Sequence, residues 1–271
     1  VPESVKQVVA ASQAQEVPLA PTAERLLLAG EIAQLDDDTL LEPIQAALKA
    51  TGVAAPAWVA SSGALAYALG AWQVAKKQAQ KVVDGLSHSG AKTVIADGPE
   101  TAWALTKVYP DLGVDLPEGV SVKLLSEVLA ENATPIEQDL GKVFVHDSRP
   151  AYLIAAEEPL HTAILPGYTA DETAFGRGQV YEAPRALVDA LGANRVWGSW
   201  TRALARSSGG DDGLWLTHPD LAAGLAQQRL DQAESLGAKT IVTDSPLAAA
   251  ILKKQAAGRQ IEVKLLAEIL V

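Results

Sequence analysis

The spacing of apolar and polar positions predicts helices that alternate with short buried strands. In residues 38–50, Leu41, Ile44 and Leu48 recur at helical spacing after an acidic start, which predicts an amphipathic helix. Comparable patterns predict three further helices, over residues 71–87, 183–191 and 219–236. The wholly apolar or β-branched runs at 93–96 and 240–243 predict buried parallel strands.

These elements belong to an internal repeat. The sequence Gly-Ala-Lys-Thr at residues 90–93 recurs at 237–240, an offset of 147. A Ser-Ser-Gly turn precedes each block, at 61–63 and 207–209, and a Val-Lys-Leu-Leu block follows each, at 122–129 and 263–270. Three blocks that recur in the same order predict two copies of one unit.

The order of elements predicts an α/β fold of two pseudo-repeated lobes, each a parallel sheet flanked by helices. We expect the first lobe over residues 1–140 and the second over 141–271, because the polar, proline-containing stretch 131–140 is typical of a boundary. Residues 157–178 have no counterpart in the first copy and are rich in proline and glycine. They predict an insertion that forms a loop over the site.

Composition narrows the function mainly by exclusion. The net charge of −11 disfavours nucleic acid as a partner, and no apolar run is long enough for a membrane span, so we expect a soluble, cytoplasmic protein. Cysteine is absent, which excludes disulfides, thiolate metal sites and cysteine nucleophiles in this chain. Methionine is also absent, even at position 1, so we expect a segment, such as a ferredoxin-like domain, to precede Val1.

The spacing of the repeated turns resembles that of a known family. Ser61-Ser62-Gly63 is followed after 34 residues by Gly98-Pro99-Glu100-Thr101, and Ser207-Ser208-Gly209 is followed after 35 residues by Ser245-Pro246-Leu247-Ala248. These pairs resemble the Cys-Cys-Gly and Cys-x-x-Cys motifs of the cysteine-rich CCG domain. That domain occurs twice in iron–sulfur subunits of glycolate oxidase, lactate-utilisation proteins, anaerobic glycerol-3-phosphate dehydrogenase and heterodisulfide reductase.

Further motifs support the resemblance over almost the whole chain. His146-Asp147-Ser148-Arg149 resembles the family's His-Asp-Pro-Cys, residues 181–185 resemble its Tyr-x-x-Pro-Arg helix start, and Gly30-Glu31 stands in place of Gly-Cys. The positions that correspond to the ligand cysteines hold Glu31, Ser61, Ser62, Gly98, Thr101, Arg149, Ser207, Ser208, Ser245 and Ala248. Since none is a thiol, the resemblance implies the family's fold without its iron–sulfur cofactor, and we expect no cofactor and no metal.

A ligand site is expected in the cleft where the turns of the two copies converge, because ligands of parallel sheets bind at the carboxyl ends of strands. The candidate ligand-binding residues are His146, Asp147, Arg149, Arg202, Ser207, Ser208, Asp211, Asp212 and Asp244. The serine pairs and the aspartates Asp97 and Asp244 are interpreted first as helix N-caps, with anion binding by the serines as the alternative. Asp211 and Asp212 alone are a weak signal for a hard cation.

Arginine and tryptophan gather in the second copy and indicate an interface. Trp197, Trp200, Trp215 and Tyr168 accompany Arg177, Arg185, Arg202 and Arg206. Residues of these types are enriched at protein interfaces, although together they also suit a carboxylate or planar ligand.

Two functions follow as hypotheses. In the first, the chain is a cofactor-free scaffold or partner-binding subunit of a redox complex and is not itself an enzyme. In the second, the emptied cleft between the lobes binds a small carboxylate or phosphate, and catalysis is left open.

Overall fold

The computed structural model describes residues 17–35, 38–134, 139–155, 179–198 and 200–271, together with residues 3, 6 and 10. The insertion expected at 157–178 and the middle of the expected linker lie outside the described residues. Within the described part of the chain, no helix is both long enough and apolar enough to cross a membrane.

The first lobe contains a four-stranded parallel sheet in the order β2-β1-β3-β4. Its strands are β1 (Arg25–Leu28), β2 (Ala57–Trp58), β3 (Thr93–Ala96) and β4 (Ser121–Leu124). Its helical segments are η1 (Ile32–Gln34), α2 (Leu41–Ala50), α3 (Ala64–Ala68), α4 (Trp72–Ser89), α5 (Pro99–Trp103), the π-helical turn η2 (Ala104–Val108), α6 (Tyr109–Asp111) and α7 (Leu125–Asn132).

The second lobe repeats this arrangement with a sheet in the order β6-β5-β7-β8. Its strands are β5 (Lys142–His146), β6 (Asn194–Arg195), β7 (Thr240–Thr243) and β8 (Glu262–Leu265). Its helical segments are α8 (Arg149–Ala155), α9 (Gln179–Ala190), η5 (Arg202–Leu204), η6 (Asp211–Gly213), α10 (Leu214–Thr217), α11 (Pro219–Ser235), α12 (Pro246–Ala256) and η7 (Leu266–Ile269). The expected α/β fold with two pseudo-repeated lobes is therefore confirmed.

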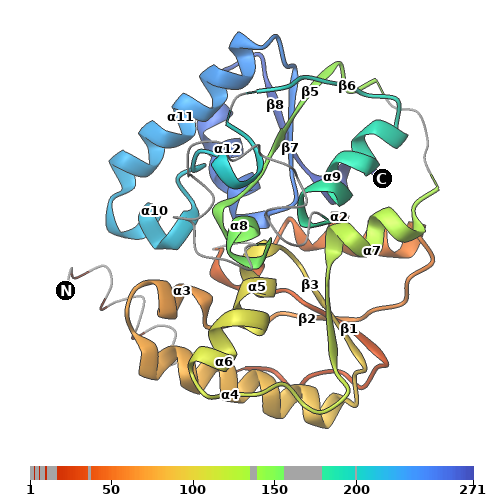
Figure 1. The fold of residues 1–271 in the computed structure, drawn as a ribbon, viewed down its shortest axis with the longest axis vertical. Coiled ribbons are helices and arrows are strands. Elements are labelled where there is room, and N and C mark those ends of the chain that lie inside the picture. The colour runs from red at the N-terminus through yellow and green to blue at the C-terminus, as the bar shows by residue number, and fades with distance from the viewer. Residues whose placement is uncertain are drawn as a thin grey trace, which may run out of the picture.

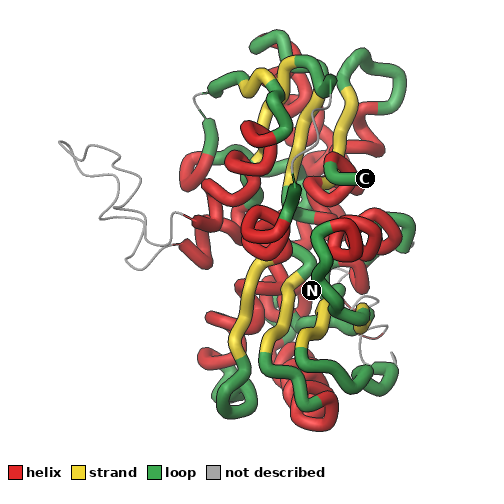
Figure 2. Tube along the Cα trace, turned by 90° about the vertical axis from the view of Figure 1, so that its right-hand side faces the viewer, coloured by secondary structure: helices red, strands yellow, loops and turns green. Residues whose placement is uncertain are grey.

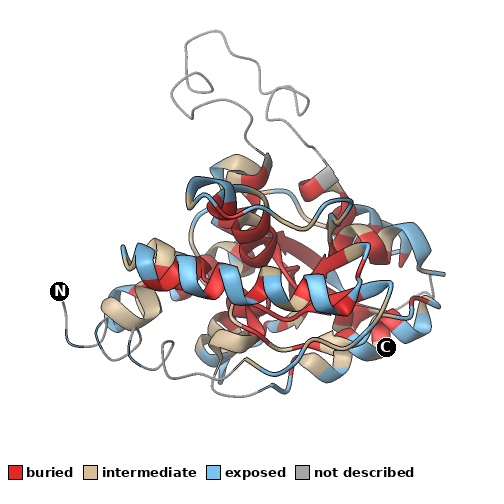
Figure 3. Cartoon of the chain, turned by 90° about the horizontal axis from the view of Figure 1, so that it is seen from below, coloured by how far each residue is buried: buried red, intermediate tan, exposed pale blue. Residues whose placement is uncertain are grey.

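The two sheets lie one above the other along the long axis of the molecule (Figure 1 and Figure 2). One hydrophobic cluster crosses from lobe to lobe, with Leu27 and Leu48 on one side and Val143 and Leu187 on the other. Helix α7 packs against α9, and α2 packs against η7. Helix α4 covers the outer side of the first sheet and buries only its inward face (Figure 3).

The starts of two helices differ from the sequence prediction by more than one residue. The first helix begins at Leu41 and not at 38, because the amide of Leu41 donates to Asp38 O at 2.7 Å in a preceding turn. Helix α9 begins at Gln179, so Pro184 lies inside the helix and does not mark its start. The strands predicted at 93–96 and 240–243 have those bounds in the structure.

The repeated blocks have structural causes. Glycines 63 and 209 adopt φ of 84° and 87°; a side chain at 209 would collide with the backbone of the long helix behind it at Ala222, and one at 63 would crowd it at Ala75. In the Val-Lys-Leu-Leu blocks, the carboxylates of Glu127 and Glu268 accept hydrogen bonds from the amides of Leu124 and Leu265. The blocks therefore mark turns and helix starts that both lobes need.

Two helical glycines give a matched test of packing. Gly85 in α4 lies against the ring of Trp58, whereas Gly224 in α11 faces open space. We expect Gly85→Ala to destabilise the protein by about 1–3 kcal/mol through overpacking. Gly224→Ala should instead stabilise it by about 0.5–1 kcal/mol, because alanine favours helix. Urea denaturation of both variants measures the two shifts; changes of the same sign would contradict this packing.

Candidate functional site

The two lobes meet at the side chain of Glu31, which is fully buried. Its Oε1 accepts a hydrogen bond from the amide of Glu100 at 2.8 Å, at the start of α5. Its Oε2 accepts from the hydroxyl of Ser245 at 2.6 Å and from the amide of Leu247 at 3.2 Å, at the start of α12. One carboxyl group thus joins the first helical turns of two helices that belong to different lobes.

The surroundings of Glu31 are acidic. Asp97 and Glu100 are also buried, and Asp97 accepts from the amides of Glu31 and Ile32 and from the hydroxyl of Thr101. Burial, followed by the neighbouring Asp97 and Glu100, raises the pKa of Glu31 well above its ordinary value. Burial also raises the pKa of Asp97.

The expected cleft is closed at these residues. The sequence correctly suggests that the turns of the two copies converge, but Glu31, Ser62, Thr101 and Ser245 are buried where they meet. The same close packing explains the glycine at position 98, because a side chain there would collide with the Glu31 carboxyl and with Pro246. The region is a packed interface and not an open cleft.

The interpretation of the serines and aspartates as helix N-caps is wrong in most cases. Each serine of the two pairs accepts from an amide two residues ahead, and the N-cap of α3 is Gly63. Asp97 accepts from the amides of Glu31 and Ile32 and from the hydroxyl of Thr101 in α5, but the N-cap of α5 is Gly98. Asp244 accepts a long hydrogen bond, 3.5 Å, from the hydroxyl of Ser126 in the other lobe. Ser245 does cap α12, since its hydroxyl accepts from the amide of Ala248.

The second lobe contains a buried ion pair in place of the acidic cluster. Asp147 follows β5 and accepts two hydrogen bonds from Arg185, both at 2.7 Å, with each side chain almost fully buried. Asp147 also accepts from the amide of Arg202 at 2.6 Å, and Arg202 has a left-handed φ of 53°. Burial and the nearby Asp147 raise the pKa of Asp244 to about 7.

The loop at 207–213 closes over the same end of the sheet. Asp211 Oδ1 accepts from the amide of Arg149 at 3.4 Å, and burial raises the pKa of Asp211. Ser208 is buried, and Ser207 is half-buried. The side chain of Asp212 lies outside the described residues. Among the described residues, no group of three or more acidic or histidine side chains is placed to hold a metal ion.

His146 contacts Arg229. The sequence interpretation named His146 as a candidate residue but not Arg229. Arg229 Nε donates to His146 Nδ1 at 2.9 Å, and both side chains are buried. Burial and the adjacent guanidinium lower the pKa of His146 well below its ordinary value, so the imidazole is neutral. Arg229 could have been found from its spacing, because it shares a helix face with the apolar Ala222, Ala226 and Ala233.

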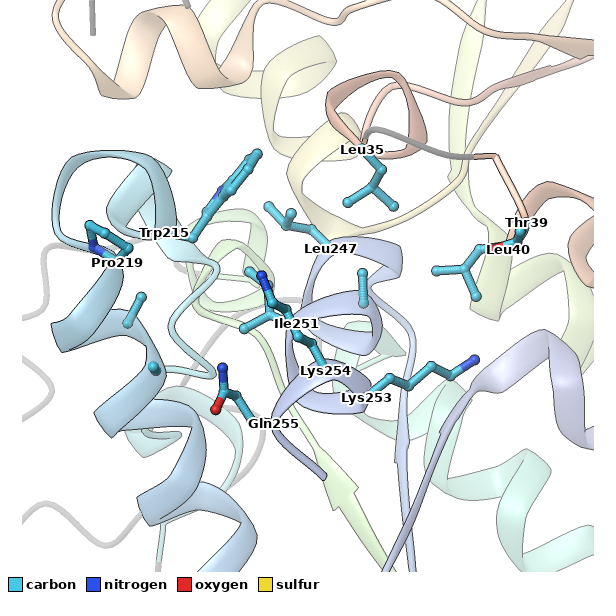
Figure 4. Close-up of a pocket in the computed structure, with 13 residues that line it drawn as sticks. Leu35, Thr39, Leu40, Trp215, Pro219, Leu247, Ile251, Lys253, Lys254 and Gln255 are labelled. Carbon is cyan, nitrogen blue, oxygen red and sulfur yellow. The ribbon is translucent and has the colours of Figure 1, made fainter. Parts of the chain in front are cut away.

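A separate groove runs over α12 between α11 and the first lobe (Figure 4). Its volume is about 440 Å³. Trp215, Leu247 and Ile251 form much of its apolar wall, and Lys253 and Lys254 lie along it. Lys253 is paired with Glu268.

Comparison with known proteins defines the fold and not the function. No protein-family model and no curated protein matches the sequence. A hypothetical protein from Helicobacter pylori has a similar structure, with a TM-score of 0.60 and 10% sequence identity over 99% of this chain. The chain spans about half of that protein, 53% of its length. Glutamate racemase isoform RacE1 from Bacillus anthracis matches at a TM-score of 0.38 and 12% identity, over 92% of this chain and 78% of the racemase.

Removal of the Glu31 carboxyl tests its role in joining the lobes. Glu31→Ala leaves the amides of Glu100 and Leu247 and the hydroxyl of Ser245 without their acceptor. We expect the free energy of unfolding to fall by about 2–4 kcal/mol. Glu24→Ala, at an exposed position, is the matched control and should change it by less than about 0.5 kcal/mol. Urea denaturation measures both; equal losses would contradict the assignment.

Glu100 gives the stability a pH dependence of unusual sign. Burial raises its pKa from 4.5 to about 7, so the folded protein retains a proton that the unfolded chain releases. The free energy of unfolding should therefore fall as the pH rises from about 4.5 to about 7, by up to about 3 kcal/mol for this group. Asp244 acts in the same direction.

Glu100→Gln cannot titrate and should flatten this profile, whereas Glu24→Gln should leave it unchanged. Urea denaturation at a series of pH values across this window measures the slopes. A Glu100→Gln profile as steep as that of the parent protein would show that the carboxyl is not the cause.

Proposed function

We propose that this chain is a cofactor-free relative of CCG-domain iron–sulfur subunits that acts as a scaffold or partner-binding subunit of a redox complex. The observation that carries the proposal is the use of the former ligand positions as internal contacts. Glu31 and Ser245 stand at two such positions, one in each lobe, and their side chains are hydrogen-bonded to each other at 2.6 Å.

The residues at these positions do not fit an iron–sulfur cluster. Gly98 and Ala248 have no side-chain donor atom, and both oxygens of Glu31 are occupied by hydrogen bonds. The serine and threonine hydroxyl groups at the other positions are hard ligands, whereas iron–sulfur clusters are held by soft thiolates. We therefore assign no electron-transfer step to this chain, and its proposed role is the contact with a partner.

An exposed surface of the second lobe supports a partner-binding role. Trp197, Trp200 and Leu204 are 61%, 42% and 52% exposed within one short segment. The guanidinium of Arg195 lies 4.4 Å from the ring centre of Trp197, and that of Arg206 lies 4.5 Å from that of Trp200. Stacked arginine and tryptophan side chains are enriched among the residues that dominate binding energy at interfaces.

The alternative, a small-anion site in the cleft between the lobes, has little support at the first lobe. The Glu31 carboxyl already accepts the hydrogen bonds of the free amides at the starts of α5 and α12.

The partner-binding role predicts that mutation of this surface reduces capture of the partner. The tagged protein, cross-linked in extract of its source cells, should capture a subunit that itself carries a flavin or an iron–sulfur cluster. The double variant Trp197→Ser/Trp200→Ser should capture at least about tenfold less, because each such residue contributes about 1–2 kcal/mol or more to binding. Trp72→Ser, which removes a tryptophan that is 63% exposed in the first lobe, is the matched control.

Three results would overturn the proposal. One is stoichiometric iron or zinc in the purified chain. Another is capture that the double variant and the Trp72→Ser variant reduce equally. The third is a captured partner that carries no redox cofactor.

A further inference from the structure

The groove over α12 has the size and the lining of a small-molecule site. Its volume of about 440 Å³ lies in the range of such sites, which are concave and mostly apolar with a few polar groups. Leu35 and Leu40 of the first lobe contribute to its wall, together with Trp215 of α10 and Leu247 of α12 (Figure 4). None of the positions that correspond to the family's ligand cysteines lines it, and neither does the exposed surface at residues 195–206.

The internal repeat shows that this groove distinguishes the second lobe from the first. Helices α5 and α12 both begin at a proline, Pro99 and Pro246, so the fifth residue of each helix is equivalent. That residue is Trp103 in the first lobe and Ala250 in the second. The ring of Trp103 packs edge-on against Tyr67 of α3, with 5.8 Å between the ring centres. Ala250 lines the groove, so the second lobe has open space beside the helix position at which the first lobe has a packed indole.

A lysine gives the apolar wall a positive end. Lys254 stands three residues after Ile251 and seven after Leu247, so the three share one face of α12. The side chain of Lys254 lies beside that of Ile251 (Figure 4). Among the described residues, the ammonium group of Lys254 has no ion pair and no hydrogen bond, whereas that of Lys253 is held by its ion pair.

The charge and polarity of the lining define the class of ligand. None of the described residues that line the groove is acidic, although the chain has 33 acidic and 22 basic residues. An anionic group at Lys254 therefore meets a positive charge and no carboxylate among these lining residues. The rest of the ligand must be apolar, because it lies against Trp215, Leu247 and Ile251, where removal of apolar surface from water supplies the binding free energy.

We propose that this groove binds a small carboxylic acid with one carboxylate and an apolar body, the carboxylate at Lys254 and the body against Trp215 and Ala250. Aromatic acids and medium-chain fatty acids share this chemistry. Because Leu35 and Leu40 belong to the first lobe, the bound acid contacts both lobes. The proposal is independent of the partner-binding role, which rests on a different surface.

Isothermal titration calorimetry distinguishes the two sources of such a ligand. Naphthylacetate represents the aromatic acids and decanoate the fatty acids. Each is compared with its neutral amide, and acetate serves as the acid without an apolar body. We expect at least one of the two larger acids to bind saturably, about threefold or more tighter than its amide, which is the contribution of one exposed ion pair. Acetate should give no saturable binding.

Two variants separate the charge from the space. Lys254→Gln changes an exposed side chain, so the fold should be retained while the preference for the acid over its amide is lost. Lys239→Gln is the matched control, because Lys239 is also exposed in the second lobe but does not line the groove. Ala250→Trp introduces the residue that the first lobe has at this position, and it should weaken both acid and amide at least about tenfold by filling the groove. Circular dichroism checks that each variant is folded.

A resonance from the groove wall locates the bound acid. In ¹⁵N-tryptophan-labelled protein, saturation should shift the indole resonance of Trp215 and leave that of Trp72, which is exposed in the first lobe, unchanged.

The proposal is overturned if neither larger acid binds saturably, if the amides bind as tightly as the acids, or if Lys254→Gln and Lys239→Gln bind equally. It is also overturned if the Trp215 resonance does not respond to an acid that binds. A dimer in sedimentation velocity that Ala250→Trp dissociates would overturn it as well, because a second copy of the chain would then occupy the groove.

Discussion

The Glu31 carboxyl is the contact on which the arrangement of the two lobes depends. Helix starts carry free amides and partial positive charge, and in this protein α5 and α12 direct theirs at the same side chain. These hydrogen bonds offset the free-energy cost of burying Glu31 among other acidic side chains. The helix pairs α7–α9 and α2–η7, with the hydrophobic cluster between them, then close the remainder of the interface.

The two copies share a backbone frame, but the charged side chains at their strand ends differ. In the first copy the strand ends hold Asp97, Glu100 and Glu31, and the donors around them are satisfied within the chain. In the second copy the equivalent region holds Arg185 and Arg229 together with the buried Asp147, Asp211 and Asp244. The strand order and the glycine turns are common to both, whereas these charged side chains are not.

The repeat, the strand pattern and the fold class could be predicted from the sequence because they depend on local spacing and on blocks that occur twice. The contacts of the site could not. Glu31 and Ser245 are 214 residues apart, and nothing local distinguishes Glu31 from an exposed glutamate. Asp97 follows a strand, as a cap would, yet its carboxylate serves a different turn. Arg229 follows two glutamines in a helix, so it resembles a solvent-exposed residue although its spacing places it on the buried face.

Gly98 has a consequence for how this protein can change. Its missing side chain makes room for the Glu31 carboxyl, so a larger residue at 98 requires that Glu31 move or be lost first. Loss of Glu31 alone removes the hydrogen bonds between the lobes. A bulkier side chain at 98 therefore displaces the Glu31 carboxyl from its hydrogen bonds to Glu100, Ser245 and Leu247 and lowers the stability of the protein.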